Sequence, residues 1–160
     1  RVAIARALVI EPSFVVADEP TSMLDASIRT GIMRLMTDLA ERLEVSYLYI
    51  THDLAVARYM CGRIAVMYLG KIVEIGETEE LLQHPLHPYT KALLSAVPVP
   101  DPTVKRPQVE IEGGVTRPVD PPPICRFYDR CPIREDVCRT SPHPPLEDKG
   151  GGHLAACYRV

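Results

Sequence analysis

Two adjacent carboxylates and a distant histidine are the residues of this sequence whose types and spacing suit chemistry. Asp18 and Glu19 follow the short apolar run 14–17, and His52 follows a second apolar run, 45–50. Hydrolysis of a nucleoside triphosphate needs a carboxylate that holds a cation on the phosphates, a group that orients the attacking water, and donors for charge on the γ-phosphate. We expect Asp18 to hold Mg²⁺ through water, Glu19 to act as general base, and His52 to donate to the γ-phosphate.

Each of these residues also has an ordinary structural interpretation. An Asp-Glu pair after a strand is common, and a single histidine at a strand end is more often a capping or surface residue. The prediction therefore rests on the three residues jointly, and on the elements that would bring them to one edge of a sheet.

Those elements are predicted by the hydrophobic pattern. Residues 14–17 predict a buried strand, 26–43 an amphipathic helix and 45–50 a second strand, which together form a unit with a parallel crossover. Further expected elements are a helix over 1–9, a helix over 54–60 capped by Asp53, hairpin strands over 64–69 and 71–75 around Gly70, a short helix after Glu77, and a helix over 89–97.

Composition divides the chain near residue 84 and limits its partners. The sequence is 46% hydrophobic and 24% charged with a net charge of −3, so it offers no basic surface and nucleic acid is not an expected partner. No apolar run approaches the roughly 20 residues that cross a bilayer. Of the 16 prolines, 14 lie between Pro85 and Pro145. We therefore expect an α/β part over 1–84 and a mostly irregular, Pro- and Cys-rich extension over 85–160.

The carboxylate segment is also the basis of a family resemblance. The stretch 17–25, Ala-Asp-Glu-Pro-Thr-Ser-Met-Leu-Asp, together with 1–8 before it and Thr-His-Asp at 51–53, resembles the Walker B strand, D-loop and H-loop of ATP-binding-cassette (ABC) ATPases. The resemblance implies a P-loop NTPase fold with a mainly parallel sheet. It also implies that Asp18 is the Walker B aspartate, Glu19 the catalytic glutamate and His52 the switch histidine, with Ser22 and Asp25 in the D-loop at a dimer interface.

Other motifs of that family are missing from the 160 residues. The sequence contains no Gly-x-x-x-x-Gly-Lys-Ser/Thr P-loop, no Q-loop and no signature motif, and it opens at Arg1 on a run typical of a helix interior. We expect the chain to be the C-terminal portion of a longer ATPase. We also expect this portion alone not to hydrolyse ATP measurably, whereas the full-length protein does.

The proline-rich part narrows the resemblance to one subfamily of ABC ATPases. The stretch 84–98, His-Pro-Leu-His-Pro-Tyr-Thr-Lys-Ala-Leu-Leu-Ser-Ala-Val-Pro, resembles the extension on ATPase subunits of oligopeptide, dipeptide and nickel importers. This implies a peripheral protein on the cytoplasmic face of the cell membrane. The implied partners are a second ATPase subunit, identical or different, two membrane permeases, and an extracytoplasmic substrate-binding protein. The sequence does not identify the solute, which could be a peptide, nickel or another small molecule.

Four cysteines of the extension, which we call the four-cysteine set, predict a metal centre. They are Cys125, Cys131, Cys138 and Cys157, with intervening gaps of five, six and eighteen residues. In a cytosolic protein such thiols bind a metal or stay reduced, and four thiolates can hold either zinc or an iron–sulfur cluster. Since the importer ATPases that the tail resembles include members with a [4Fe-4S] cluster, we favour that cluster over Zn²⁺. His143 and His153 are expected at the surface.

Two other classes of function fit part of the sequence. One is a catalytically inactive module in which only the four-cysteine set and a dimer surface act. The other is an ABC ATPase that works outside transport, for example in DNA repair or translation, and the importer-like tail disfavours it. Co-purification with membrane subunits would favour the importer, whereas metal binding without nucleotide binding would favour the module.

Overall fold

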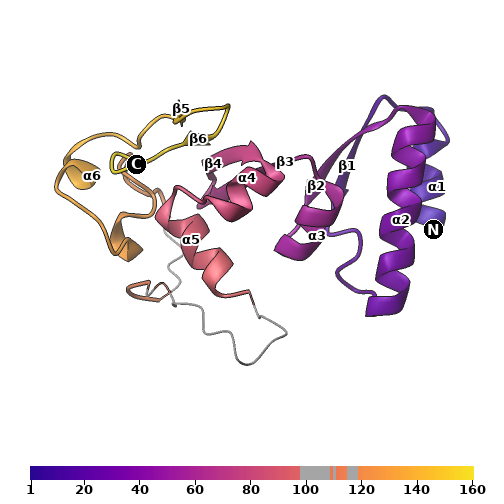
Figure 1. Ribbon diagram of the computed structural model, residues 1–160, viewed down its shortest axis with the longest axis horizontal. Helices are drawn as coiled ribbons and strands as arrows, with labels where there is room; N and C mark the ends of the chain where they lie inside the picture. Colours follow the sequence, from indigo (N-terminus) through magenta and orange to yellow (C-terminus); the bar gives the residue numbers. More distant parts are fainter. Residues whose placement is uncertain (98–108, 110, 115–118) are drawn as a thin grey trace. The chain divides into compact units, whose positions relative to one another are not determined.

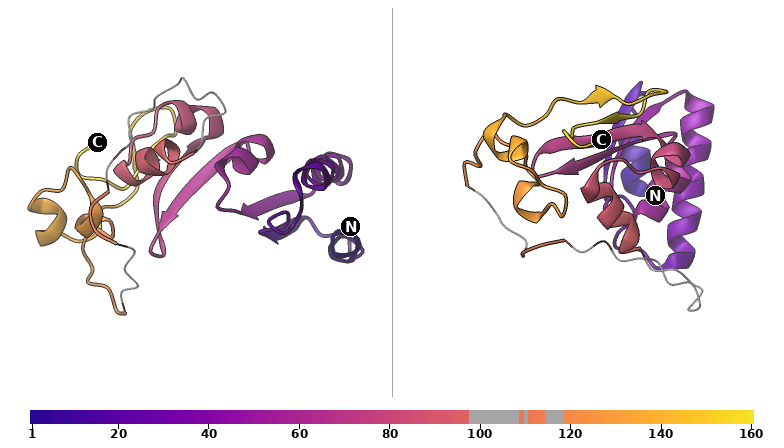
Figure 2. Two further views of the ribbon diagram at one scale, coloured as in Figure 1. Left: turned by 90° about the horizontal axis from the view of Figure 1, so that it is seen from below. Right: turned by 60° about the vertical axis from the view of Figure 1, so that its left-hand side comes forward.

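The computed structural model describes residues 1–97, 109, 111–114 and 119–160. Its backbone divides into two units, Arg1–Cys61 and Gly62–Val160, which we describe separately (Figures 1 and 2). Unit 1 contains α1 (Val2–Leu8), β1 (Phe14–Asp18), α2 (Ala26–Leu43), β2 (Ser46–Ile50) and α3 (Leu54–Met60). Unit 2 contains β3 (Arg63–Tyr68), β4 (Lys71–Glu77), α4 (Thr78–Gln83), α5 (Pro88–Ser95), the 3₁₀ turn η1 (Tyr128–Arg130), α6 (Val137–Thr140), β5 (Glu147–Asp148) and β6 (Leu154–Ala155).

Unit 1 is the predicted strand, helix and strand with a parallel pairing. β1 and β2 run parallel, with Phe14 opposite Ser46 and Asp18 opposite Ile50. Helices α1 and α2 lie side by side against one face of this sheet (Figures 1 and 2). The core consists of Ala17, Ile32 and Met36, with partly buried side chains packed against it from α1, β2, α3 and the loop after β1.

The expectation that β1 is a buried strand is only half correct. Side chains alternate across a strand, so each face must be covered separately. Ala17 is 7% exposed on the helix-covered face, whereas Phe14 and Val16 on the other face are 53% and 55% exposed. Leu48 and Ile50 continue this open face along β2. The strand is therefore covered on one side among the described residues.

Unit 2 is built on an antiparallel sheet with the strand order β3-β4-β6-β5. The β3–β4 hairpin turns at Leu69 and Gly70, and the positive φ of Gly70, 76°, is the conformation that glycine adopts at little cost. β6 pairs with β4, and β5 pairs with β6, both antiparallel. The described residues therefore form an α/β structure with one parallel sheet, as expected, and one antiparallel sheet that contains the predicted hairpin, because a tight hairpin can join only antiparallel strands.

Aromatic rings and the helix after the hairpin form the core of unit 2. Tyr68 of β3, Tyr89 of α5 and Phe127 pack together with ring-centroid distances of 4.6, 5.2 and 5.5 Å. Phe127 is 1% exposed, and Val73 and Leu81 are fully buried. The segment predicted as mostly irregular therefore contributes a buried ring, two short strands and short helices to an ordered unit.

The structural division lies at Cys61 and Gly62, whereas the composition changes near residue 84. The difference arises because β6, from the end of the chain, adds to the hairpin strand β4 and so joins residues on both sides of position 84. The assignment of 1–84 to an ATPase domain and 85–160 to an extension concerns family membership and stays a prediction. In the described part of the chain, no helix combines the length and apolar character needed to span a membrane.

Candidate functional site at the ends of β1 and β2

The register of the two parallel strands brings Glu19 and His52 to one edge of the sheet. Asp18 pairs with Ile50 in the last rung of the ladder. The backbone N–H of Glu19 then donates to the carbonyl of Ile50 at 2.9 Å, which extends the pairing by one residue. The carboxyl ends of parallel strands are the usual location of ligand sites in such sheets.

Glu19 and His52 are in direct contact at this edge. His52 Nδ1 lies 2.5 Å from Glu19 Oε1, and the backbone N–H of His52 donates to the same oxygen at 3.3 Å. The His52 side chain is 80% exposed and that of Glu19 36% exposed, so the pair faces solvent. The predicted general base and the predicted switch histidine, which are 33 positions apart in the sequence, thus form one polar pair.

Glu19 has an unusual backbone conformation. Its φ is 46°, in the left-handed region that residues with a Cβ rarely adopt and that costs of the order of 1 kcal/mol. The conformation reverses the chain directly after β1, so Glu19 leaves the strand and its carboxylate can meet His52. Strained residues of this kind are concentrated at functional sites.

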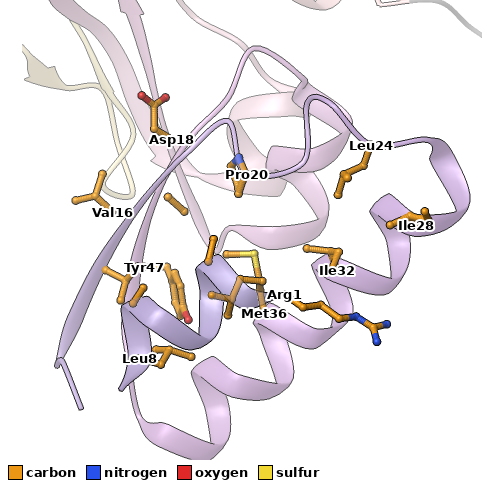
Figure 3. Close-up of a pocket in the computed structure, with 15 residues that line it drawn as sticks. Arg1, Leu8, Val16, Asp18, Pro20, Leu24, Ile28, Ile32, Met36 and Tyr47 are labelled. Atoms are coloured by element: carbon orange, nitrogen blue, oxygen red, sulfur yellow. The ribbon is translucent and has the colours of Figure 1, made fainter. Parts of the chain in front are cut away.

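Asp18 ends β1, and its side chain is exposed. Figure 3 shows its carboxylate directed away from the apolar side chains of Ile32 and Met36. A carboxylate that stays solvated at a strand end is the type of ligand that Mg²⁺ uses while it keeps most of its water. The donor chemistry at Asp18 therefore fits the predicted role in holding Mg²⁺.

The loop after Glu19 is closed by local hydrogen bonds. Ser22 Oγ donates to the Glu19 carbonyl at 3.0 Å, and Asp25 is the N-cap of α2, with its Oδ1 accepting from the backbone N–H of Ile28 at 3.0 Å. The hydrogen bond from Ile28, with another from the Ser27 hydroxyl, lowers the pKa of the Asp25 carboxyl. The predicted D-loop residues thus shape the loop, whereas a dimer interface is untested by a single chain.

Arg29 was not predicted from the sequence and connects the loop after β1 with the loop after β2. Its Nη2 donates to the Leu24 carbonyl at 3.3 Å, and its Nη1 lies 3.4 Å from Asp53 Oδ2. Asp53 also caps α3 through its other oxygen, which accepts from Ala55 and Val56. An arginine four residues after an N-cap aspartate, as Arg29 is after Asp25, is too common a pattern to have indicated this role from the sequence.

An apolar cavity of about 520 Å³ lies next to the Asp18 end of β1, among α1, β1 and α2 (Figure 3). Its lining includes Ile4, Leu24, Ile28 and Tyr47. The Tyr47 hydroxyl is buried and has no hydrogen-bond partner among the residues that the structure describes, and burial raises the pKa of this phenol. The cavity is lined mainly by aliphatic side chains and offers few groups that could recognise a polar ligand.

The four-cysteine set lies in unit 2, and all four residues are described. None of them is in a disulfide. The Cys125 N–H donates to the Cys138 carbonyl at 3.2 Å, and burial raises the pKa of Cys125 to about 11, with a smaller contribution from the other three thiols. Within the described residues, however, no three Cys, His, Asp or Glu side chains lie close enough to hold a metal ion. The predicted metal centre is therefore not confirmed.

The structure corrects the expectation for one histidine of the tail. His153, predicted at the surface, is 5% exposed, and its Nε2 lies 2.7 Å from Oε1 of the fully buried Glu74. His143 is partly buried, and its Nδ1 accepts from the Arg126 N–H at 3.3 Å. A charged residue inside the apolar strand Ile72 to Ile75 was the sequence signal that could have indicated Glu74, since such a residue needs a buried partner.

Comparison with known proteins shows which proteins this chain resembles in sequence. Residues 73–138 match the family described as "Oligopeptide/dipeptide transporter, C-terminal region". The chain carries that region and is related over its whole length to ATP-binding proteins of peptide transport systems.

Three relatives illustrate the relationship. A protein of Brucella ovis, named for peptide import and ATP binding, is 48% identical over 159 residues, which are 99% of this chain and 50% of that protein. The dipeptide transport ATP-binding protein DppF of Haemophilus influenzae is 44% identical over 160 residues, covering 100% of this chain and 49% of that protein. The oligopeptide transport ATP-binding protein AppF of Bacillus subtilis is 42% identical over 160 residues, 99% of this chain and 48% of the relative. The chain thus spans about half the length of these relatives.

Proposed function

We propose that this chain is part of the nucleotide-binding subunit of an ABC importer that couples ATP hydrolysis to the uptake of peptides. The observation that carries the proposal is the contact between Glu19 and His52 at the ends of two parallel strands. The names of the relatives, which specify ATP binding and peptide transport, support the same conclusion. The fold we propose is the C-terminal part of a P-loop NTPase domain over 1–84, followed by an importer-type extension over 85–160.

In this proposal each residue of the site has a separate task. Asp18 holds Mg²⁺, which neutralises charge on the phosphates of ATP when it is bound. Glu19 accepts the proton of the attacking water, and His52 donates to the γ-phosphate and orients the Glu19 carboxylate. Ser22 and Asp25 fix the loop that faces a second ATPase subunit. Phosphate-binding groups of the P-loop type are absent from these 160 residues, so hydrolysis requires residues beyond them.

The proposed partners follow from the proposed subfamily. The subunit would pair with a second ATPase subunit, the same or different, and would dock on two permeases at the cytoplasmic face of the membrane. An extracytoplasmic protein would deliver the solute. Peptides are the proposed solute because each of the three relatives described is named for peptide, dipeptide or oligopeptide transport.

Replacement of Glu19 by Gln in the full-length protein tests the catalytic assignment. Gln keeps the shape of the side chain but cannot accept the proton, so we expect ATP to bind normally and hydrolysis to fall at least about 100-fold, the lower range of a general-base effect. ATP turnover and retention of labelled ATP are the measurements. The matched control is Glu11→Gln, at an exposed glutamate before β1 that also has a positive φ. Normal turnover in Glu19→Gln would refute the assignment.

A second candidate function concerns metal binding by the four-cysteine set. We propose a structural [4Fe-4S] cluster, with Zn²⁺ as the alternative, because four free cysteines lie in short, proline-rich segments that a metal centre would stabilise. The thiols of the described residues would have to move closer together to bind it. Its four proposed ligands are Cys125, Cys131, Cys138 and Cys157. In this arrangement the metal centre supports the tail, and the chain without ATPase partners would retain only this binding function.

Anaerobic purification followed by iron, sulfide and zinc analysis tests this second candidate. We expect about four iron and four sulfide per chain, with a broad visible absorption band. A Cys138→Ser variant should lose most of the iron, whereas the same change at Cys61, outside the four-cysteine set, should not. One zinc and no iron would favour a zinc site, and absence of both metals would refute the metal proposal.

A further inference from the structure

A buried carboxylate, Glu74, lies in the middle of unit 2 outside the proposed ATPase site. It occupies β4, which is flanked by β3 and β6, and its exposed fraction is 0%. Burial of an ionised carboxylate is strongly unfavourable unless hydrogen-bond donors replace the lost water. The donors that surround Glu74 therefore indicate which segments the residue holds in place.

Glu74 receives donors from two distant segments of the chain. Its Oε1 accepts from the backbone N–H of Leu86 at 2.8 Å, and its Oε2 accepts from the N–H of His87 at 2.9 Å. His153 Nε2, 79 positions away, lies 2.7 Å from Oε1. One carboxylate thus joins the segment before α5 and the segment before β6 to the central strand.

The imidazole of His153 lies close to the backbone of Gly76. A Cβ atom built on Gly76 would lie 3.1 Å from His153 Cδ2, which is tighter than most packing contacts, and 3.4 Å from Cγ, so the ring would have to shift by a few tenths of an ångström. The ring therefore lies directly against the backbone of β4, two residues beyond Glu74. This close approach gives a second way to perturb the histidine without altering the carboxylate.

The strand next to His153 leads directly to the last cysteine of the four-cysteine set. β6 pairs with β4 through only two rungs, Glu74 with Ala155 and Ile75 with Leu154, and one further bond runs from the Ala156 N–H to the Val73 carbonyl. Such a short strand has little stability of its own. Cys157 follows immediately, and its placement depends on whether β6 stays paired.

The other side of Glu74 supports the loop that carries two more of the cysteines. His87, whose N–H binds Glu74, packs its ring against Phe127 at a centroid distance of 5.7 Å. Phe127 lies between Cys125 and Cys131 and is 1% exposed. Glu74 therefore reaches the Cys125–Cys131 loop only through His87 and Phe127, whereas it contacts His153, four residues before Cys157, directly.

From these contacts we infer that Glu74 is a positioning residue for the C-terminal segment that carries Cys157, because it anchors His153 and β6 to the sheet. The inference goes beyond the proposed transport function and does not depend on it. It also holds whether the thiols bind iron, zinc or no metal, because it concerns the backbone that carries them.

Thiol alkylation of the reduced, metal-free 160-residue chain tests the inference. N-ethylmaleimide labelling followed by mass spectrometry gives a separate rate for each cysteine. In Glu74→Gln, an amide replaces one acceptor oxygen and faces a donor, so we expect Cys157 to react at least about tenfold faster than in the unaltered chain. The matched control is Glu77→Gln, at the exposed end of the same strand, which should leave the rate unchanged.

Two outcomes would overturn the inference. One is a Cys157 rate in Glu74→Gln that stays within about twofold of the control. The other is an equal rise at Cys125, Cys131 and Cys138, which would mean that Glu74 supports the whole unit and not the C-terminal segment in particular.

A second variant keeps the test decisive if Glu74→Gln fails to fold. Gly76→Ala pushes on the His153 ring and leaves Glu74 intact, so Cys157 should again react faster than in the unaltered chain. Gly62→Ala is its control, since a Cβ there would meet nothing within 4 Å. Equal Cys157 rates in these two alanine variants would contradict the role given to His153.

Discussion

At the scale of single residues, His87 shows how a sequence motif acquires a physical role. It is 1% exposed, and its Nδ1 accepts from the backbone N–H of Tyr89 at 3.1 Å, so the side chain is the N-cap of α5. An imidazole can accept at Nδ1 only when that nitrogen carries no proton. Burial, with smaller contributions from His143 and Lys91, lowers the pKa of His87 to about 4. The fold therefore requires the neutral form.

This requirement predicts that stability falls as the solution is acidified. The pKa of His87 is about 4 in the folded chain and near the ordinary 6.5 when unfolded, so the unfolded chain binds more protons between these values. The contribution of neutral His87 is complete above pH 6.5 and is lost as the pH falls toward 4, by about 3 kcal/mol in all. Urea unfolding at a series of pH values measures it.

The control for this pH dependence is a variant that keeps the cap but cannot titrate. His87→Asn supplies an amide oxygen to the Tyr89 N–H, so its free energy of unfolding should change less between pH 6.5 and 4 than that of the unaltered chain. His84→Asn, at an exposed histidine, should retain the full dependence. Equal slopes for His87→Asn and the unaltered chain would disprove the assignment.

At the scale of elements, Arg29 connects two loops that carry the proposed catalytic residues. It reaches from α2 to the loop after β1 and to Asp53, the cap of α3, one residue after His52. The ion pair is about one third exposed on both sides, so its own contribution to stability is small, of the order of 0.5 kcal/mol. The cap made by Asp53 is expected to contribute more, about 1 kcal/mol.

A double-mutant cycle separates these two contributions. Asp53→Asn keeps an acceptor for the cap and removes the charge, whereas Asp53→Ala removes both. We expect Asp53→Ala to lower the free energy of unfolding by about 1 kcal/mol more than Asp53→Asn, and the coupling between Arg29→Met and Asp53→Asn to stay below about 1 kcal/mol. A coupling well above that value would mean that the pair is a major support of the loops.

At the scale of the whole molecule, the position of the boundary between units is the central question. The proline content changes near residue 84, but the pairing of β6 with β4 joins residues on both sides of that position. Unit 2 also has its own buried core, which includes Val73, Leu81 and Phe127. All the strands of its sheet, β3-β4-β6-β5, lie from Gly62 onward.

Two truncated chains distinguish these boundaries. Residues 62–160 retain the hairpin, the aromatic core and the β4–β6 ladder, so we expect a cooperative thermal transition and dispersed amide signals in an NMR spectrum. Residues 85–160 lack the hairpin and with it Tyr68, Val73 and Glu74, so we expect no cooperative transition. If both chains unfolded cooperatively, the ordering of the tail would not depend on the hairpin.

Local features of this protein were determined by the sequence alone. The helix over 26–43, the Asp53 cap and the turn at Gly70 are observed where they were expected. The meeting of Glu19 and His52 also followed from sequence, because two parallel strands joined by one crossover helix end at the same edge. Each of these depends on periodicity, capping or turn chemistry within a short stretch of chain.

Only the tertiary structure decided the remaining features. Three of these features connect residues that lie 24 to 81 positions apart in the sequence. They are the ion pair of Arg29, the burial of His153 on Glu74, and the pairing of β6 with β4. A single sequence gives no signal for such pairs, because a histidine or a two-residue strand has no local preference for burial. The position of His153, for example, depends on which hydrogen-bond donors can reach the buried carboxylate of Glu74. The folded structure alone brings those donors within reach.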